Sequence, residues 1–569
     1  MKTTLHVLIL VLLGSTVIAA DDLDSRIATL ETRLPTMLDA ADIPGIQIAA
    51  VDGDAIVWQR ALGIARLSDG RRVDLDTLFE SASLSKPVFA RIAFDEVAAE
   101  RLDLDRPIDA SFAYERIAHE PRAKTITATH ALGHSSGMPN WQDEPLATTP
   151  IDLMFAPGER FGYSGEGYVY LQKAIEHATG KTLQTLAEER VFKPLAMRQS
   201  SFIWSEQVGA AAADGHDRFG SPRPLHNADA GISASSLFTT AGEYARFLRD
   251  ELARADHPGF QPVTPIVLDR QGEPMPEGVL SWAPGWGIYQ HEGRKLVWHW
   301  GDNGQFRGFV AAEPETRRGI VFFTNSQNGL RLIEPIVRTF FDLELDTLLS
   351  WLGYREYDEE KLLAKNRIRQ IFLDQGTEMG LVAFSEAIRN EPDEGLVLTL
   401  TGELRAHDLP DAAAGVLERF TTMHGDASAD VWGTLGQYRA DRGEYGAALE
   451  ALEAALALDP EDEPRQRWVT WVQDLERVSA EPISLPATQR DKWVGTYGPR
   501  AVMAEGDALY YQRAPNPRYK LIPLSDDTFA LEGLTFFRFR IETDESGAPT
   551  RIVGMYVDGR EDHSPRDPG

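Results

Sequence analysis

The order of strand-like and helix-like stretches is the feature that most constrains the fold of this chain. Residues 45–67, "GIQIAAVDGDAIVWQRALGIARL", have the pattern of two buried strands around a turn at Asp52 to Asp54. Apolar residues then recur at helical spacing over about residues 78–248, and strand-like stretches return over residues 295–325. This order predicts an α+β domain in which the two ends of the segment share one antiparallel sheet, with helices packed on its faces.

A second, helical region follows this domain. Residues 361–478 are rich in alanine, and a period of about 34 residues is clearest over residues 429–462. One period earlier, Leu398 and Ala414 are in register, but Glu418 stands where the repeat has an apolar residue. The region resembles tetratricopeptide repeats, whose helix pairs must stack to bury their apolar faces. A plain bundle of helical hairpins is the alternative.

The last region, residues 488–560, is strand-like again. Stretches such as "ALYYQRA" alternate with turns rich in Gly and Asp, which predicts a small all-β domain, an antiparallel barrel or sandwich. We expect the final residues, "EDHSPRDPG", to be disordered.

Composition and the first residues bear on partners and location. The chain has 569 residues, no cysteine and a formal net charge of −30, which argues against nucleic acid and anionic membranes as partners. The lack of cysteine excludes disulfides, a cysteine nucleophile and a thiolate metal site. Residues 1–20 combine a lysine, a short apolar run and small residues before Asp21, the pattern of a secretory signal peptide. We therefore expect a periplasmic or secreted protein without stable membrane insertion, and an uncleaved anchor is the alternative.

A serine and a lysine three positions apart open a predicted helix in "FESASLSKPVFARIAFDEVAAE". One helical turn would bring Ser83 and Lys86 to the same face, where a buried, neutral lysine can remove the serine proton. Pro87 fits best in the first turn of a helix, which places Ser83 at the helix N-terminus, where the dipole favours a developing anion. Taken alone, the pair has a plainer alternative, a helix start with a solvated lysine.

Two later stretches complete a set of motifs. "FAPGERFGYSGEGYVYLQKAI" and "KLVWHWGDNGQFRGF" resemble, in order, the second and third motifs of the class C β-lactamase and D-alanyl-D-alanine peptidase family. The stretches "TITATHALGHSSGMPNW", "AGISASSLFTTAGEYARFL" and "GWGI" match its non-catalytic landmarks, so the resemblance covers residues 21–345. It implies a β-lactamase/transpeptidase-like catalytic domain that forms an acyl-enzyme on Ser83. "WVGTYGPR" in the last region is similar to the lipocalin-like module attached to many such hydrolases.

The resemblance also implies roles for the other site residues. Tyr163 matches the tyrosine of the Tyr-x-Asn motif, and its phenol would pass protons in both half-reactions. His299 and Gly301 match the third motif in a His-x-Gly form, which would place the oxyanion hole at the backbone N–H groups of Ser83 and Asp302. A core tyrosine and a strand-packing histidine are the alternatives for Tyr163 and His299.

Two departures from the family pattern bear on the substrate. Gly165 stands where the family has an asparagine that binds a substrate amide, and His299 replaces the lysine that attracts a substrate carboxylate. Both changes weaken recognition of β-lactams and peptidoglycan termini but leave the acyl chemistry intact. We expect His299 to become charged below about pH 6.5 and then to improve β-lactam hydrolysis. His134 is expected to be a structural residue beneath the site.

The sequence therefore predicts an exported serine hydrolase that cleaves a small-molecule ester or amide, most simply as an esterase. A D-stereospecific peptidase or weak β-lactamase is one alternative. A non-catalytic binding protein that uses the helical repeats is another, and the repeats are where we expect any protein or peptide partner. No cofactor is expected, and no His-Glu-x-x-His or similar zinc pattern is present, so no metal is expected either.

Overall fold

The computed structural model describes residues 23–142, 146–254, 258–354, 357–514 and 516–567. The predicted signal peptide, residues 1–20, lies outside the described residues. The chain forms two compact units, residues 1–362 and 363–569, and each is described by itself. Within the described ranges, no helix has both the length and the apolar character needed to cross a membrane.

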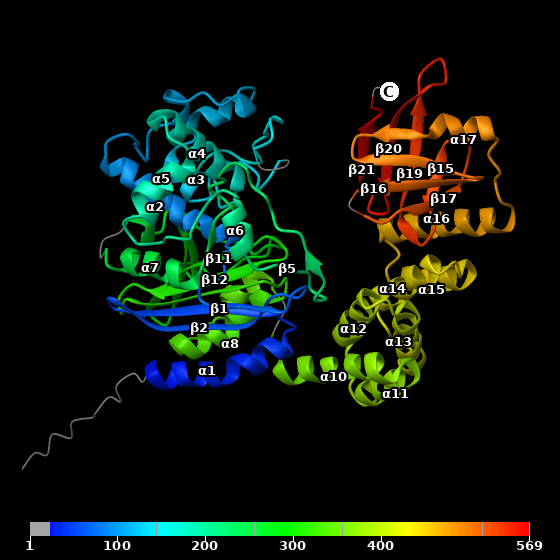
Figure 1. Cartoon of the computed structure of the whole chain (residues 1–569), viewed down its shortest axis with the longest axis horizontal. Helices are drawn as coiled ribbons and strands as arrows, with labels where there is room; N and C mark the ends of the chain where they lie inside the picture. The colour runs from blue at the N-terminus through cyan, green and yellow to red at the C-terminus, as the bar shows by residue number, and fades with distance from the viewer. Residues whose placement is uncertain (1–22, 143–145, 255–257, 355–356, 515, 568–569) are drawn as a thin grey trace, which may run out of the picture. The chain divides into compact units, whose positions relative to one another are not determined.

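The first unit is built around a nine-stranded antiparallel sheet. Its strands are β1 (Gly45–Asp52), β2 (Ala55–Arg66), β3 (Arg71–Arg72), β8 (Thr264–Pro265), β9 (Leu280–Ala283), β10 (Trp286–His291), β11 (Arg294–Asp302), β12 (Arg307–Glu313) and β13 (Arg318–Thr324). They lie in the order β3-β2-β1-β13-β12-β11-β10-β9-β8 (Figure 1). β1 pairs with β13, with Ile46 opposite Thr324. The predicted sharing of one sheet by early and late strands is therefore confirmed.

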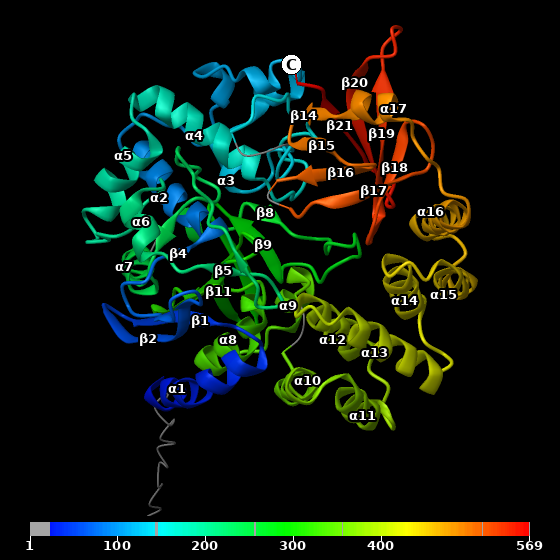
Figure 2. The ribbon, with the colours of Figure 1, turned by 45° about the vertical axis from the view of Figure 1, so that its right-hand side comes forward.

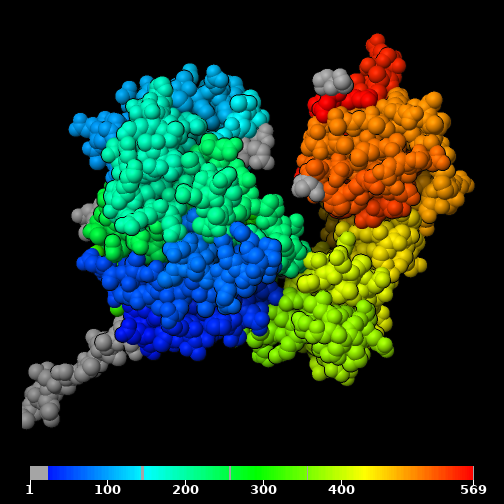
Figure 3. Space-filling model, in the orientation of Figure 1, coloured from blue at the N-terminus to red at the C-terminus, as the bar shows by residue number. Residues whose placement is uncertain are grey.

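Helices cover both faces of this sheet. They are α1 (Leu23–Ala40), α2 (Ser85–Ala98), α3 (Ala128–Leu132), α4 (Gly165–Thr179), α5 (Leu183–Ala187), α6 (Glu206–Ala211), α7 (Ala241–Leu252), α8 (Ile333–Phe341) and α9 (Asp346–Leu352), with two short strand pairs, β4 (Phe79–Glu80) with β7 (Phe238–Thr239) and β5 (Gly215–His216) with β6 (Pro222–Arg223). Figure 1 shows α1 and α8 below the sheet and α2 and α7 above it. On the face of this unit that Figure 3 shows, the region of β1 and β2 (blue) lies next to the helical segment that follows them in the chain (cyan).

Alternation along β11 assigns its side chains to two cores. Trp298 and Trp300 pack in the core that contains α1, α8 and α9, whereas Val297 packs in the core that contains α2, α4 and α7. Trp351 on α9 belongs to the first of these cores. The first compact unit therefore extends past residue 345, and the end of the catalytic domain at that residue stays a prediction.

The second unit begins with paired helices. They are α10 (Glu359–Gln375), which spans the boundary, α11 (Thr377–Ile388), α12 (Glu394–Ala406), α13 (Pro410–Met423), α14 (Ala429–Asp441), α15 (Tyr445–Leu458), α16 (Glu463–Ala480) and α17 (Ala487–Trp493). α12, α14 and α16 start at intervals close to the predicted period, and α10 to α15 share one apolar core. The predicted helical character of this region is confirmed, and its assignment to tetratricopeptide repeats stays a prediction.

The second unit ends in an eight-stranded antiparallel sheet whose strands follow chain order (Figure 2). They are β14 (Gly495–Tyr497), β15 (Arg500–Glu505), β16 (Ala508–Arg513), β17 (Tyr519–Pro523), β18 (Thr528–Leu531), β19 (Leu534–Thr543), β20 (Pro549–Tyr556) and β21 (Glu561–Pro565). The predicted all-β domain is confirmed. The predicted disorder of its tail is wrong over β21, because β21 pairs with β20 and the Ser564 hydroxyl accepts a hydrogen bond of 3.0 Å from buried Arg500.

Candidate active site

The candidate nucleophile lies in a tight turn between β4 and α2. Ser83 belongs to the 3-10 turn η1 (Ala82–Leu84), and α2 starts two residues later at Ser85. Ala82 has a φ of 50°, a left-handed conformation that is strained for a residue with a Cβ. Two side chains hold it: the Ser81 hydroxyl donates to a backbone carbonyl before β7 at 2.8 Å, and the Ser85 hydroxyl donates to the Ala82 carbonyl at 2.6 Å. The turn therefore presents Ser83 at the start of the helix, as predicted.

Strand β11 approaches this turn at Gly301. A Cβ on Gly301 would lie 2.2 Å from the Ser81 carbonyl oxygen, so only glycine fits at this position. The next residue, Asp302, lines the same pocket as Ser83. The close approach explains why the third motif needs a glycine, and it brings the backbone of β11 beside the nucleophile turn.

Lys86 lies in the first turn of α2, within hydrogen-bond distance of Ser83. Its Nζ atom is 3.0 Å from Ser83 Oγ and 2.9 Å from the carbonyl oxygen of Ala234. Only 1% of the residue is exposed, and this burial lowers the pKa of Lys86 well below its ordinary range. A neutral amine that donates to Ala234 keeps its lone pair for the Ser83 hydroxyl, which is the arrangement a general base needs.

Tyr163 lies just before helix α4, beside Lys86. The Ser164 hydroxyl caps α4 by accepting a backbone N–H of its first turn at 2.9 Å, and Lys86 Nζ lies 4.7 Å from the centre of the Tyr163 ring. Burial raises the pKa of Tyr163 above its ordinary range, and the nearby Ser83 hydroxyl and the charge of Arg270 oppose this only in part. The Tyr163 hydroxyl makes no hydrogen bond of normal geometry within the described residues. At neutral pH it is a proton donor.

Two buried histidines pack beside these residues. His134 Nδ1 accepts the Ser164 N–H at 3.0 Å, and its ring lies 4.2 Å from the Tyr163 ring. His299 Nδ1 donates to the next carbonyl along the chain at 2.8 Å, and its side chain does not line the pocket that contains Ser83. Burial lowers the pKa of His299 to about 3. The expected charging of His299 below about pH 6.5 is therefore wrong, because the fully buried ring cannot keep the water that a cation needs.

The chain is similar to a known protein family. A family model described as "Beta-lactamase" matches residues 30–335. The chain belongs to the beta-lactamase family. Members of this family are serine hydrolases, and the resemblance predicted from the motifs is confirmed. Among the residues that the structure describes, no group of three His, Asp or Glu side chains is arranged to hold a metal ion.

Several known proteins are similar to this beta-lactamase family member. Esterase EstB of Burkholderia gladioli is 29% identical over 320 residues, which cover 46% of this chain and 79% of the esterase. Penicillin-binding protein 4 of Amycolatopsis lactamdurans is 25% identical over 315 residues, covering 50% of this chain and 81% of that protein. Unguisins hydrolase ungD' of Aspergillus campestris is 23% identical over 392 residues, covering 62% and 72%. The solved beta-lactamase/D-alanine carboxypeptidase of Pseudomonas syringae is 18% identical with a TM-score of 0.47, covering 56% of this chain and 98% of that one.

The position of the missing family asparagine is occupied differently here. A Cβ on Gly165 would lie 2.6 Å from the Trp141 ring, so a larger residue would require this ring to move. Asn140 lines the pocket, and its Oδ1 accepts the Gly165 N–H at 3.1 Å. Asn140 therefore supplies a side-chain amide to the pocket, although it comes from a different segment than the family asparagine. Asn140 was not predicted, although it belongs to the landmark "GMPNW", because the landmark does not reveal which side chain faces Gly165.

The pocket around Ser83 has a volume of about 760 Å³. Of the predicted site residues, Ser83, Tyr163 and Asp302 line it, whereas Lys86, His299 and Gly301 do not. Other walls are aromatic or come from residues 265–272, which comprise the last residue of edge strand β8 and the segment after it (Figure 2). Two arginines, Arg160 and Arg270, also line the pocket. Neither was predicted from the sequence: Arg160 lies within the second motif stretch but has no assigned role there, and Arg270 lies outside the motifs.

Proposed function

We propose that the protein is an esterase-type serine hydrolase that forms an acyl-enzyme on Ser83. The observation that carries this proposal is the 3.0 Å distance between Lys86 Nζ and Ser83 Oγ, with Lys86 buried and its pKa lowered. A serine beside a neutral amine is an activated nucleophile. Membership of the beta-lactamase family supports serine hydrolase chemistry, and similarity to a protein named Esterase EstB supports an ester substrate.

In acylation, Ser83 Oγ attacks the substrate carbonyl carbon while the Ser83 proton passes to neutral Lys86. The carbonyl oxygen becomes an oxyanion, which the backbone N–H groups of Ser83 and Asp302 would stabilise. The bond to the leaving oxygen then breaks, and this oxygen takes a proton from Tyr163. Lys86 returns its proton to Tyr163, so the amine is neutral again.

In deacylation, a water molecule attacks the carbonyl carbon of the Ser83 ester. Its proton passes through Tyr163 to Lys86 as the second tetrahedral intermediate forms. When the bond to Ser83 Oγ breaks, Lys86 gives this proton to Ser83. The products are the free acid and the original site.

The surroundings of Gly165 and His299 support an ester rather than a β-lactam. The Trp141 ring fills the space beside Gly165, and His299 is buried and neutral, so neither supplies the contacts that the family asparagine and lysine would make. A D-stereospecific peptidase or weak β-lactamase is the second candidate. It is supported by the Asn140 amide at the pocket and by similarity to a protein named Penicillin-binding protein 4.

Export, domain boundaries and the use of the helical region belong to the same proposal. The pattern of residues 1–20 supports export to the periplasm or medium. The catalytic domain then starts near residue 21, followed by the helical region over residues 361–478 and the β domain over residues 488–560. The stacked helices support a protein or peptide partner for this region, because repeat arrays offer extended binding surfaces.

A fluorophosphonate probe tests the central step, because it forms a stable adduct only with an activated serine. Mass spectrometry of the digested protein should locate the adduct on Ser83. Ser83→Ala should abolish labelling and lower the turnover of p-nitrophenyl butyrate at least about a thousandfold. Ser68→Ala, which changes an exposed serine between β2 and β3, is the matched control. An adduct on another serine, with Ser83→Ala still active, would overturn the proposal.

A further inference from the structure

The pocket around Ser83 contains a positive charge that the proposed mechanism does not use. The guanidinium carbon of Arg270 lies 5.1 Å from the centre of the Trp351 ring, 5.4 Å from that of Trp300 and 5.9 Å from that of Tyr354. These three rings hold the guanidinium by cation–π contacts, which occupy none of its N–H groups in hydrogen bonds. Arg270 is therefore positioned in advance of any ligand.

The carboxylates near Arg270 interact with other groups. Asp302 pairs with Arg307 at 2.9 Å and accepts the Tyr354 hydroxyl at 3.2 Å. Asp269 accepts two backbone N–H groups of its own turn, at 2.9 Å and 2.8 Å. Across the described residues, the Arg270 side chain forms no ion pair or hydrogen bond. Its five N–H donors are available to a molecule in the pocket.

We propose that Arg270 binds a carboxylate of the substrate, and that the substrate is an ester or amide carrying a free carboxylate across an apolar spacer. This inference rests on the proposed function, because it concerns the same pocket. A guanidinium matches a carboxylate with two parallel hydrogen bonds, and its charge is permanent at all relevant pH values. Val267 and Leu268, 49% and 46% exposed, line the pocket beside Arg270 and provide the apolar contact for the spacer.

Two further observations support this assignment. The positive charge of Arg270 opposes the rise in the pKa of Tyr163, the catalytic tyrosine. Arg270 therefore lies near the reacting atoms. The chain has a net charge of −30, which repels anions at long range. Recognition of an anionic substrate therefore requires a local fixed charge. Arg270 supplies it from the segment after β8, whereas the third motif on β11 has only the neutral His299.

The test compares two pairs of esters that differ in one charge. The first pair, p-nitrophenyl hydrogen glutarate and its methyl ester, carries the carboxylate on the acyl group. The second pair, 4-carboxyphenyl butyrate and its methyl ester, carries it on the leaving group. In one of the two pairs, kcat/KM should be about 10- to 100-fold higher for the anion, as expected for a charge-assisted bidentate contact. The favoured pair assigns the side on which the carboxylate lies.

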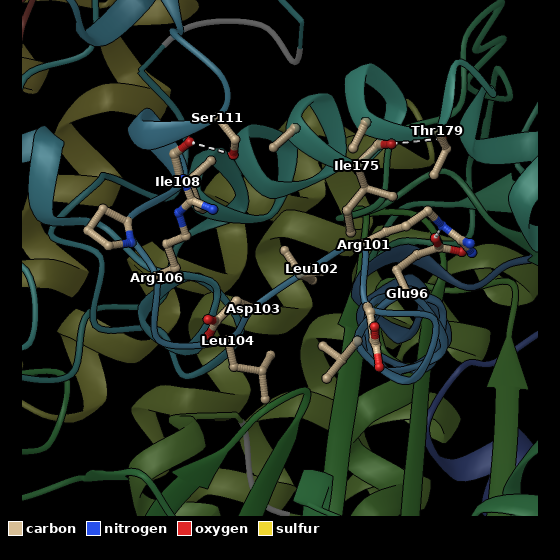
Figure 4. A pocket seen from close by; sticks show the side chains of 15 residues that line it. Glu96, Arg101, Leu102, Asp103, Leu104, Arg106, Ile108, Ser111, Ile175 and Thr179 are labelled. Carbon is tan, nitrogen blue, oxygen red and sulfur yellow. Dashed lines mark hydrogen bonds and ion pairs between the residues drawn. The ribbon is translucent and has the colours of Figure 1, made fainter.

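Variants then locate the charge that is responsible. Arg270→Met should remove most of the preference for the anion, and Arg270→Lys should keep part of it, because lysine retains charge without the bidentate geometry. Arg106→Met is the matched control: Arg106 lines a separate hollow of about 580 Å³ between α2 and α4 (Figure 4) and also has no ion pair within the described residues. It should leave the preference unchanged.

Three results would overturn the inference. They are equal or lower kcat/KM for the anion in both pairs, an undiminished preference in Arg270→Met, and a loss of the preference in Arg160→Met instead. Failure of the proposed function looks different, because neither neutral nor anionic esters would then be hydrolysed and Ser83 would not react with the fluorophosphonate. Higher salt should reduce the preference of the wild type for the anion, because screening weakens a partly exposed ion pair.

Discussion

Glu251 makes the stability of the catalytic unit depend on pH. It lies on α7, fully buried, and its Oε1 accepts a hydrogen bond of 2.9 Å from Arg91 on α2, the helix that carries Lys86. Burial raises the pKa of Glu251 from 4.5 to about 7, more than the neighbouring Arg91 lowers it. Between these two values, the folded protein keeps a proton that the unfolded chain has released. The free energy of unfolding must therefore fall as pH rises through this window.

The size of this effect follows from the two pKa values. At about 1.36 kcal/mol per pH unit, the difference between 4.5 and about 7 corresponds to about 3 kcal/mol in total, of which about 2 to 3 kcal/mol is lost between pH 5 and pH 8. Glu251→Gln keeps the shape of the side chain but cannot ionise. Relative to the wild type, this variant should gain about 2 to 3 kcal/mol of stability from pH 5 to pH 8.

Urea unfolding of the full chain at pH 5, 6, 7 and 8 measures this difference. Loss of fluorophosphonate labelling, scaled at each pH to the value without urea, reports on the unit that contains Ser83, and tryptophan fluorescence follows the whole chain. Glu115→Gln, which removes an exposed carboxyl group, is the control and should show no such trend. A stability difference between Glu251→Gln and the wild type that stays constant from pH 5 to pH 8 would refute the reasoning.

Ester hydrolysis should decline as pH falls through the lowered pKa of Lys86. Nitrocefin hydrolysis should show no gain near pH 6.5, the ordinary pKa of histidine, because burial lowers the pKa of His299 to about 3. A gain in nitrocefin hydrolysis near that pH would contradict the lowered pKa of His299. Gly301→Ala should lower kcat for esters at least about tenfold, because the new methyl group would lie 2.2 Å from a backbone oxygen of the Ser83 turn; a folded variant with unchanged kcat would contradict this close approach. A chain that ends at residue 362 should keep small-ester turnover. A chain that ends at residue 345 should lose most of this turnover, because it lacks Trp351, which forms a wall of the pocket. Equal turnover in the two truncated chains, both folded, would refute this prediction.

Local patterns were sufficient to predict the antiparallel sheet of the first unit and the closeness of Ser83 and Lys86. β1 and the strands over residues 295–325 have apolar runs that are buried in the sheet, as predicted. The predicted burial is wrong for β2, the second strand of the hairpin around Asp52 to Asp54, which is mostly half-buried or exposed. Ser83 in η1 and Lys86 in the first turn of α2 are three residues apart along consecutive helical turns, so their spacing alone predicts that they meet. Tyr163 lies far from them in sequence and was found through the order of the motifs.

Features that depend on tertiary packing could not be predicted in this way. Arg270 enters the pocket from a segment without a motif, and Asn140 from a landmark that assigns it no role, so only the folded chain brings them to Ser83. The pKa of His299 is set by complete burial, which its position on a strand does not reveal. β21 has few apolar residues, and pairing with β20 together with the contact between Arg500 and Ser564 decides its structure.

The place of β8 in the sheet has a consequence for how this enzyme can be altered. β8 is the outermost strand, only two residues long, and it pairs with β9 alone. A change in length next to an edge strand breaks no interior ladder, unlike a change beside β11, where Gly301 contacts the nucleophile turn. The segment over residues 265–279, which carries Arg270, is therefore a natural site for loop grafting. Exchanging it would change which molecules the enzyme selects while the atoms that carry out the chemistry stay where they are.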